Sequence, residues 1–139
     1  MNVKQVIVVR TKYPDGEGGT RGVRRGKEIA QACHASIAFL TRRIRRKKDG
    51  DAVFARHKSN FEDAVWEWLH GSFAKVCVRV DSEEELLEIH EKALAAGLES
   101  HLITDSGKTE FKEPTNTCLA IGPDEAEKID EITGHLKLL

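Results

Sequence analysis

The sequence contains no apolar run long enough to cross a membrane, and only three of its 139 residues are cysteine. A membrane-spanning helix needs about 20 mostly apolar residues, and the short apolar run near the N-terminus does not have the layout of a signal peptide. Cys33, Cys77 and Cys118 are odd in number and widely spaced, so they indicate neither a disulfide framework nor a zinc site. We therefore expect a single cytoplasmic domain over residues 1–139, with no membrane partner.

Motifs of several common enzyme classes are absent as well. The loop at 13–22 carries four glycines after an apolar strand, but neither G-x-x-x-x-G-K-S/T nor G-x-G-x-x-G can be placed in it. This excludes a mononucleotide P-loop and a dinucleotide-binding fold, and we read the loop as a flexible connection. The sequence also lacks a G-x-S-x-G elbow and metal-ligand spacings. Cys33 directly precedes His34, so on a helix their side chains diverge by about 100° and do not form a nucleophile pair.

Charge is unevenly distributed along the chain, although the net charge is only −1. Residues 1–48 contain 13 Lys and Arg against 3 Asp and Glu, whereas residues 49–139 contain 9 against 20. The basic part ends in a cluster at residues 42–48, a patch that a polyanion such as nucleic acid would bind. Cations are also favourable at the end of a helix, so charge alone leaves both interpretations open.

The periodicity of apolar residues predicts alternating strands and helices. We expect strands near residues 6–9, 74–80, 101–104 and 117–121. We expect four helices: 27–48, a short one from Asn60 to Gly71, one from Ser82 to Gly97, and one that opens at Gly122-Pro123 and ends at Gly134. In the short helix, Trp66 is expected to pack and Trp68 to lie at an interface or at the surface, with core filling as the common alternative for either ring. This order predicts an α/β sandwich with helices on both faces of a small mixed sheet.

The helix that begins at Lys27 carries two stripes at the helical period. The apolar stripe, which we expect to face the core, contains Ile29, Cys33, Ile37, Leu40 and Ile44. The polar stripe contains Lys27, Gln31 and His34. A lysine at the start of a helix is unfavourable by about 0.3–1 kcal/mol, because the helix N-terminus is already positive. This cost indicates a role other than helix stability, with a surface lysine and a packed histidine as the alternatives.

A second polar segment, 105–109, directly follows the third predicted strand. In open α/β sheets, sites gather at the carboxyl ends of the strands. If the third strand runs parallel to the first, Asp105 and Thr109 meet the polar stripe at that edge. Thr115 and Thr117 add hydroxyls on the way back to the fourth strand. Asp-Ser-Gly is also good turn chemistry, so Asp105 as a turn former is the alternative.

Six segments form an ordered set along nearly the whole chain. They are Gln5-Val6-Ile7-Val8-Val9-Arg10; Gly26-Lys27 with Ile29-Ala30-Gln31 and His34-Ala35; Val80-Asp81-Ser82-Glu83-Glu84-Glu85-Leu86; Asp105-Ser106-Gly107-Lys108-Thr109; Leu119-Ala120-Ile121-Gly122-Pro123; and Ile129-Asp130 with the ending from Thr133 to Leu139. Each segment is weakly specific alone. In this order they resemble the peptidyl-tRNA hydrolases of the second, archaeal and eukaryotic, type.

The resemblance implies a three-layer α/β/α sandwich with a four-stranded mixed β-sheet, often as a homodimer. It implies hydrolysis of the ester that joins a peptide to the 3′ end of tRNA, so peptidyl-tRNA is the expected partner, and no metal or organic cofactor is expected. The catalytic residues expected from it are Lys27, Asp105, Thr117, His34 and Thr109. The expected substrate-binding residues are Gln31, Ser106, Gly107, Lys108 and Thr115. The candidate contacts to tRNA phosphates are Arg24, Arg25, Arg42, Arg43, Arg45 and Arg46, with Lys47 and Lys48.

The chain departs from the family pattern in three places. It has Asp105-Ser106-Gly107 where Asp-Ala-Gly is common, and its segments 11–25 and 49–72 are longer than usual. The expected mechanism has Asp105 orient or deprotonate a water while Lys27 stabilises charge on the carbonyl or ribose oxygen. These two roles are interchangeable on sequence grounds. A non-catalytic RNA-binding or adaptor protein is one alternative, and hydrolysis of another acyl ester or amide is the other.

Overall fold

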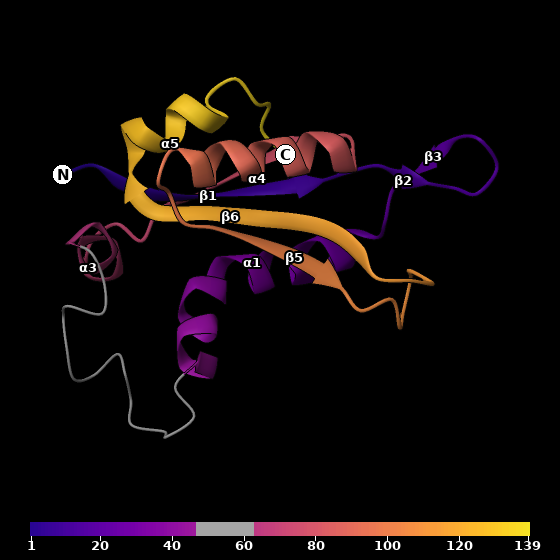
Figure 1. Ribbon diagram of the computed structural model, residues 1–139, viewed down its shortest axis with the longest axis horizontal. Helices are drawn as coiled ribbons and strands as arrows, with labels where there is room; N and C mark the ends of the chain where they lie inside the picture. The colour runs from indigo at the N-terminus through magenta and orange to yellow at the C-terminus, as the bar shows by residue number, and fades with distance from the viewer. Residues whose placement is uncertain (47–62) are drawn as a thin grey trace.

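The computed structural model describes residues 1–46 and 63–139 of the chain. Six strands and four helices lie in these residues (Figure 1). The strands are β1 (Val3–Arg10), β2 (Tyr13–Pro14), β3 (Thr20–Arg21), β4 (Lys75–Val80), β5 (Ser100–Asp105) and β6 (Thr115–Glu125). The helices are α1 (Arg25–Arg46), α3 (Asp63–His70), α4 (Glu83–Ala95) and α5 (Ala126–Thr133). The predicted end of the first helix at Lys48 and the predicted cap at Asn60 lie outside the described residues.

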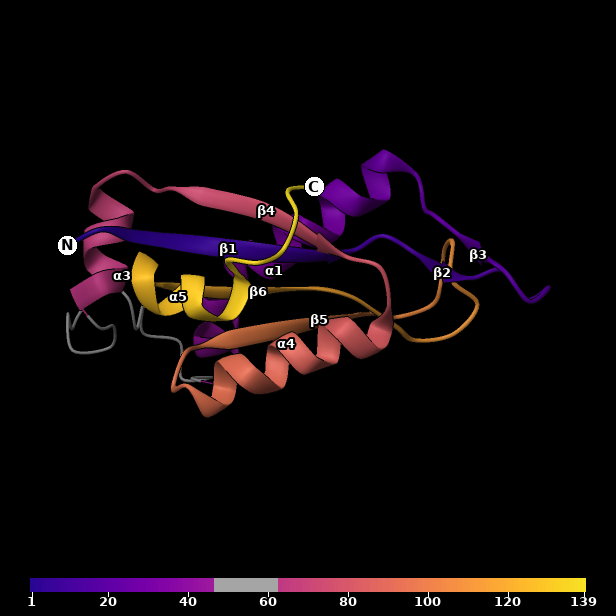
Figure 2. The same cartoon turned by 90° about the horizontal axis from the view of Figure 1, so that it is seen from above.

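Four strands form one mixed sheet in the order β4-β1-β6-β5. β4 pairs with β1 in parallel, and β6 pairs antiparallel with both β1 and β5. β1, β4 and β5 therefore point the same way and end at one edge of the sheet (Figure 2). The condition on which the predicted site depends, that the strand before Asp105 runs parallel to the first, is confirmed.

Helices cover both faces of this sheet (Figure 1). α4 and α5 pack on one face through an aliphatic core that includes Val8, Leu86 and Ile129, none of which has exposed surface. α1 and α3 pack on the other face, where Phe39 and Trp68 lie in the core. Full burial of side chains of this size stabilises the fold by about 1.5–3 kcal/mol each. The predicted three-layer sandwich is confirmed.

The side of α1 that faces the sheet differs from the predicted one. Among the side chains of this helix that the structure describes, the buried ones are Gln31, Ala35, Ala38 and Phe39. By contrast, Ile29 and Ile37 are 58% and 49% exposed, and Cys33 is exposed as well. The predicted inward stripe was therefore wrong for these three residues, whereas Leu40 packs against the core as predicted and the side chain of Ile44 lies outside the described residues. Alanines allow a helix to approach a sheet closely, and Gln31 has hydrogen-bond partners inside the protein, so close packing and polar satisfaction outweigh the count of apolar residues.

Residues 13–21 form a hairpin in the segment for which the sequence predicted a flexible connection. β2 and β3 pair antiparallel in a small separate sheet that projects beyond the edge where β1 ends (Figure 2). The carboxylate of Asp15 closes the turn by accepting hydrogen bonds from the backbone N–H groups of Glu17 at 2.7 Å and Gly19 at 3.0 Å. Aspartate is a frequent turn former because its side chain accepts such bonds from nearby backbone.

The last strand is longer than predicted, and the last helix begins later. β6 continues through Gly122 and Pro123, which are joined by a cis peptide bond. The next two residues still pair with Lys4 and Val3 of β1, beyond a shift in register. α5 begins at Ala126, so the prediction that Pro123 opens this helix was wrong. Pairing with β1 holds this segment in the sheet for three residues beyond Gly122.

The prediction for the tryptophans of α3 is confirmed for Trp66, which packs against the core, but not for Trp68, which fills the core instead of lying at the surface. Trp68 is 1% exposed, whereas Trp66 is half-buried. The ring of Trp68 meets that of Phe39 edge-on, with 6.0 Å between centroids, and its Nε1 donates to the carbonyl oxygen of Ala74 at 2.8 Å. Burial of an indole is favourable when its N–H finds an acceptor. The predicted end of this helix before Gly71 is confirmed.

The outer edge of β4 is partly covered by the last residues of the chain. The N–H of Leu139 donates to the carbonyl oxygen of Cys77 at 3.1 Å. The N–H of Arg79 donates to the carbonyl oxygen of Lys137 at 2.9 Å. Between them, Val78 faces Leu138 in an antiparallel bridge. Residues 137–139 therefore extend the sheet beyond its edge strand.

Candidate active site

Lys27 and Asp105 form an ion pair at the edge where β1, β4 and β5 end. Lys27 lies in the first turn of α1, and Asp105 is the last residue of β5. The Nζ atom of Lys27 donates a hydrogen bond to Oδ1 of Asp105 over 2.7 Å. The two side chains are 13% and 10% exposed, so the pair is largely desolvated and still reachable from solvent. The prediction that these two residues meet is confirmed.

The carboxylate of Asp105 has two further donors. Gln31 Nε2 donates to Oδ1 at 3.3 Å, and the backbone N–H of Gly107 donates to Oδ2 at 2.9 Å. The hydrogen bond from Lys27, supported by that from Gly107, holds the pKa of Asp105 below its usual range against the opposing effect of burial. Asp105 is therefore ionised at neutral pH.

Gln31 connects this carboxylate to the core. Its side chain is buried, and its Oε1 accepts a hydrogen bond of 2.6 Å from Oγ1 of Thr117, the third residue of β6. Because an amide has distinct donor and acceptor ends, this bond turns Nε2 toward Asp105. Thr117, which is itself buried, therefore acts on Asp105 through Gln31.

Lys27 has two further neighbours besides Asp105. Its Nζ donates to Oγ1 of Thr109 at 2.9 Å, as predicted from the spacing of the 105–109 segment. Nζ also lies 5.6 Å from the centroid of the Phe111 ring, within the range of a cation–π interaction. Together these contacts fix the ammonium group between the first turn of α1 and the loop that joins β5 to β6.

Gly107 is required by the shape of that loop. Its φ is +82°, in the left-handed region where residues with a Cβ are disfavoured. A Cβ atom built on Gly107 would lie 2.4 Å from the carbonyl carbon of Glu113, so the two sides of the loop touch at this point. The same close approach places the N–H of Gly107 against Asp105. Thr115, opposite Asp105 in the β5–β6 ladder, donates its hydroxyl to the carbonyl oxygen of Glu113 at 2.8 Å.

Three other predicted residues lie at the rim of this group. His34 is exposed, and its electrostatic effect is the smallest of the causes that lower the pKa of the Asp105 carboxyl. Ser106 and Lys108 are exposed on the β5–β6 loop. The core of the site is therefore built from Lys27, Gln31, Asp105, Gly107, Thr109 and Thr117.

The predicted phosphate-binding arginines fall into three groups. Arg24 pairs with Glu110 while its own side chain stays 82% exposed, and Arg25 is exposed at the start of α1. Arg42 donates to the carbonyl oxygen of Leu102 at 2.6 Å, and Arg43 pairs with Glu99 at 2.8 Å, so both brace α1 against the start of β5. The side chains of Arg45, Arg46, Lys47 and Lys48 lie outside the described residues.

Sequence reasoning missed Phe111. Its ring is 5% exposed and packs on the ring of Tyr13, with 4.8 Å between centroids, while the guanidinium of Arg21 lies 5.7 Å from it. Phe111 therefore ties the β2–β3 hairpin to the loop that holds Lys27. The available signal was a single aromatic residue in the otherwise polar segment 105–116.

Two kinds of site or segment are not found in the described part of the chain. Residues 1–46 and 63–139 contain no group of three or more His, Cys, Asp or Glu side chains placed to hold a metal ion. Among the same residues, no helix is both long and apolar enough to cross a membrane.

Comparison of the chain with known proteins identifies its family. Residues 3–139 match the family described as "Peptidyl-tRNA hydrolase PTH2". A peptidyl-tRNA hydrolase of Methanothermobacter thermautotrophicus is 43% identical over 138 residues, 99% of this chain and 100% of the relative. One of Methanocaldococcus jannaschii is 40% identical with the same coverage. A probable peptidyl-tRNA hydrolase 2 of Dictyostelium discoideum is 36% identical over 97% of this chain and 54% of its own length. The chain therefore belongs to the PTH2 family of peptidyl-tRNA hydrolases.

Proposed function

We propose that this chain hydrolyses the ester bond between the peptide and the 3′-terminal ribose of peptidyl-tRNA, with Lys27 and Asp105 as its catalytic residues. The observation that carries the proposal is the Lys27–Asp105 ion pair in a member of the PTH2 family. An ester is already reactive, so catalysis requires an oriented water and a donor for the charge that develops on oxygen. The two side chains supply one of each.

Asp105 is suited to orient the attacking water. Among the described residues, Oδ1 accepts hydrogen bonds from Lys27 and Gln31, whereas Oδ2 accepts only the N–H of Gly107. Each carboxylate oxygen has about two acceptor positions, so Oδ2 retains one for a water O–H. The lowered pKa of Asp105, caused mainly by Lys27, keeps it ionised and makes it a weak base. We therefore assign Asp105 chiefly to hold the water; it takes the proton only as the new C–O bond forms and makes the water acidic.

Lys27 supplies the complementary positive charge. An ammonium group has three N–H donors, and Asp105 and Thr109 accept two of them. The third is left for the substrate. Water oxygen adds to the carbonyl carbon, the carbonyl oxygen becomes negative, and Lys27 stabilises it. The bond to the ribose oxygen then breaks, and that oxygen takes the proton that Asp105 had removed from the water, which restores the carboxylate. One prearranged donor of this kind contributes about 10²–10³-fold to the rate.

The remaining site residues position this pair and contact the substrate. We assign Gln31 and Thr117 to orient Asp105, and Thr109 to orient Lys27. His34 and the exposed members of the loop, Ser106 and Lys108, are assigned to contacts with the substrate. Gly107 contributes its N–H and its compact backbone.

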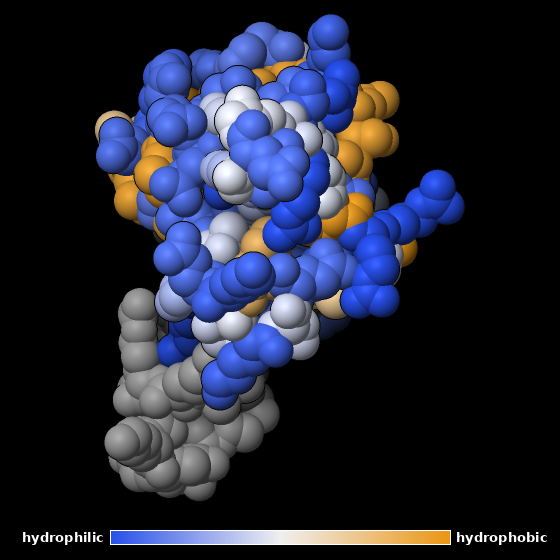
Figure 3. Space-filling view, turned by 90° about the vertical axis from the view of Figure 1, so that its right-hand side faces the viewer, coloured by the Kyte–Doolittle hydropathy of each residue, from blue (hydrophilic) through white to orange (hydrophobic). Residues whose placement is uncertain are grey.

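The tRNA is assigned to the α1 side of the site. Arg24 and Arg25 are exposed there, next to Lys27, and this end of the molecule presents mainly hydrophilic residues (Figure 3). Neutralising phosphates releases counterions, so affinity for tRNA should fall steeply as salt rises. Such a role belongs to translation and fits the cytoplasm.

We further propose that residues 1–139 form one domain and that two copies associate. The described residues share one four-stranded sheet, which supports a single domain. The exposed stripe of Ile29, Cys33 and Ile37 on the outer side of α1 supports a contact between copies. Light scattering of the protein and of an Ile29→Ser/Ile37→Ser variant tests the association, and an unchanged mass in both would contradict this contact.

The deciding experiment measures release of an N-acetylaminoacyl group from tRNA by the purified protein. We expect Lys27→Ala and Asp105→Asn to lower kcat by about 10²-fold or more, while Lys128→Ala, an exposed lysine of α5, leaves it unchanged. Circular dichroism of each variant establishes that it is folded. Full activity in both site variants would overturn the mechanism. Wild-type protein that binds tRNA without releasing the acyl group would favour the adaptor alternative.

A further inference from the structure

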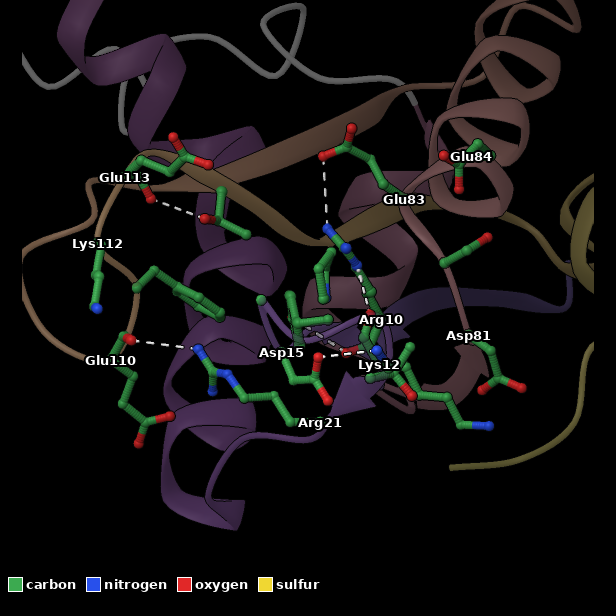
Figure 4. Close-up of a pocket in the computed structure, with 18 of the residues that line it drawn as sticks. Arg10, Lys12, Asp15, Arg21, Asp81, Glu83, Glu84, Glu110, Lys112 and Glu113 are labelled. Carbon is green, nitrogen blue, oxygen red and sulfur yellow. Dashed lines mark hydrogen bonds and ion pairs between the residues drawn. The ribbon is translucent and has the colours of Figure 1, made fainter.

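A pocket of about 970 Å³ lies beside the catalytic pair and is used by none of the steps above. Three segments line it: the β2–β3 hairpin with the residues just before it, the loop segment 110–115, and the region from Asp81 into the first turn of α4 (Figure 4). Pockets of 300–1,000 Å³ are large enough to enclose a ligand of a few amino-acid residues.

Phe111 separates this pocket from the catalytic lysine. Its ring lines the pocket and lies 5.6 Å from Nζ of Lys27. Thr115, another lining residue, is paired with Asp105 across the β5–β6 ladder. A substrate group attached to a carbonyl carbon placed beside the Lys27–Asp105 pair therefore has this pocket as its neighbouring space.

We propose that the pocket holds the peptidyl part of the substrate and favours peptides with a basic side chain near the ester; this inference rests on the proposed function. A substrate with a polyanionic half and a peptide half needs two different surfaces. The exposed cations Arg24 and Arg25 do not line the pocket, whereas its lining contains six acidic and four basic residues. The phosphates are thus drawn to the start of α1, and the peptide takes the pocket.

The pairing of the charges strengthens this assignment. Arg10 is buried against Tyr13 and is 3.5 Å from Glu83, so its charge is already compensated. Glu84 and Glu113 lie on opposite sides of the pocket (Figure 4), and neither forms an ion pair with another described residue. Lys12, Arg21 and Lys112 also line the pocket and form no ion pair with another described residue, so a cation of the ligand would be bound at Glu84 and Glu113 in particular and not by the pocket as a whole. The rings of Tyr13 and Phe111 supply an apolar wall for the stem of a long side chain.

The test compares two peptidyl-tRNAs that share the tRNA and the esterified residue. They differ only in the preceding residue, which is lysine in one and glutamate in the other. We expect kcat/KM of the wild type to be about 3- to 10-fold higher for the lysine substrate. Glu84→Lys and Glu113→Lys each reduce or reverse this preference, while Glu91→Lys, an exposed position further along the same helix as Glu84, retains it.

The outcomes separate this inference from the proposed function. Hydrolysis of both substrates without a preference, or with a preference that the two pocket variants leave unchanged, would overturn the peptide assignment and leave the esterase activity standing. A uniform fall in KM for both substrates in the variants, with tighter binding of deacylated tRNA, would place nucleic acid in the pocket instead. Absence of hydrolysis in the wild type would overturn the proposed function itself. Circular dichroism excludes misfolding as the cause of any change.

Discussion

Replacement of Thr117 by valine removes one buried hydroxyl and preserves the shape of the side chain. The hydroxyl donates to Oε1 of Gln31 at 2.6 Å, and both residues are buried, with 2% and 6% exposure. Without it, Oε1 loses its donor in a place that water hardly reaches. An unsatisfied buried polar group costs about 1–3 kcal/mol, so the free energy of unfolding should fall by that amount. For a chain of this length the corresponding fall in Tm is about 3–10 °C.

The same substitution should slow the reaction. The bond from Thr117 is what turns the amide of Gln31 so that Nε2 donates to Asp105 at 3.3 Å. When it is lost, the amide can rotate, and Asp105 loses a donor that fixes its direction. We expect kcat for release of an N-acetylaminoacyl group to fall about 3- to 10-fold with little change in KM, since no substrate contact is removed.

Thr117→Ser is the matched control. It retains the hydroxyl and loses one buried methyl group, which costs about 0.8 kcal/mol, so stability should fall while kcat stays near the wild-type value. Urea unfolding followed by tryptophan fluorescence measures the first quantity, and single-turnover kinetics the second. Wild-type kcat in Thr117→Val, or an equal loss of kcat in Thr117→Ser, would refute the positioning chain from Thr117 to Asp105.

Three further predictions concern the loop, the acid stability and the core. Gly107→Ala should lower the free energy of unfolding by more than the roughly 1–2 kcal/mol of left-handed strain, because the new Cβ also collides with the backbone of Glu113. Gly97 has a similar φ of +80° and nothing within 4 Å of a new Cβ, so Gly97→Ala should lose the strain energy alone. Denaturant titrations measure both losses. Burial raises the pKa of Glu99, but hydrogen bonds from His101 and Arg43 outweigh it and lower that pKa to about 2 from 4.5. The stabilisation that ionised Glu99 gives the fold is therefore present above pH 4.5 and lost as the pH falls toward 2. After allowance for solvent screening of this partly exposed group, it amounts to about 1 kcal/mol. Glu99→Gln should remove this contribution, so that Tm falls less on acidification than it does in the wild type. Trp68→Phe should destabilise the fold by about 1–3 kcal/mol through loss of a buried donor, and Trp66→Phe by less, as thermal unfolding will report; equal losses would contradict the roles assigned to the two rings.

Much of the fold follows from local signals in the sequence. The cap at Ser82, whose Oγ accepts the N–H of Glu85 at 3.2 Å, and the alternating strand at 75–80 both form as predicted. The failures occur where a long-range contact decides between two locally acceptable choices. Pro123 suits a helix start, but β1 pairs with the residues after it. Trp68 is fully buried with its N–H bonded to the carbonyl oxygen of Ala74, a partner that no periodicity reveals.

In the site, too, some residues are predictable from local signals and others only from long-range contacts. Lys27 and Asp105 stand out because one is unfavourable for its helix position and the other ends a strand, and the parallel direction of β5 brings them together. Phe111 gives only a weak signal, because an aromatic residue in a polar loop has a role only when its partner, here Tyr13, is known. The inward stripe of α1 was misjudged at Ile29, Cys33 and Ile37 for a related reason. Gln31 is buried in their place because Thr117 and Asp105 satisfy its amide.

The pairing of residues 137–139 with β4 has a consequence for behaviour at high concentration. An edge strand offers unpaired N–H and C=O groups, which another molecule can use to add a strand of its own. Here the N–H of Arg79 and the carbonyl of Cys77 are already taken by Lys137 and Leu139. Residues 137–139 thus block the addition of a strand from another molecule at this edge. Their removal would cause aggregation at concentrations where the reaction at Lys27 is still unaffected.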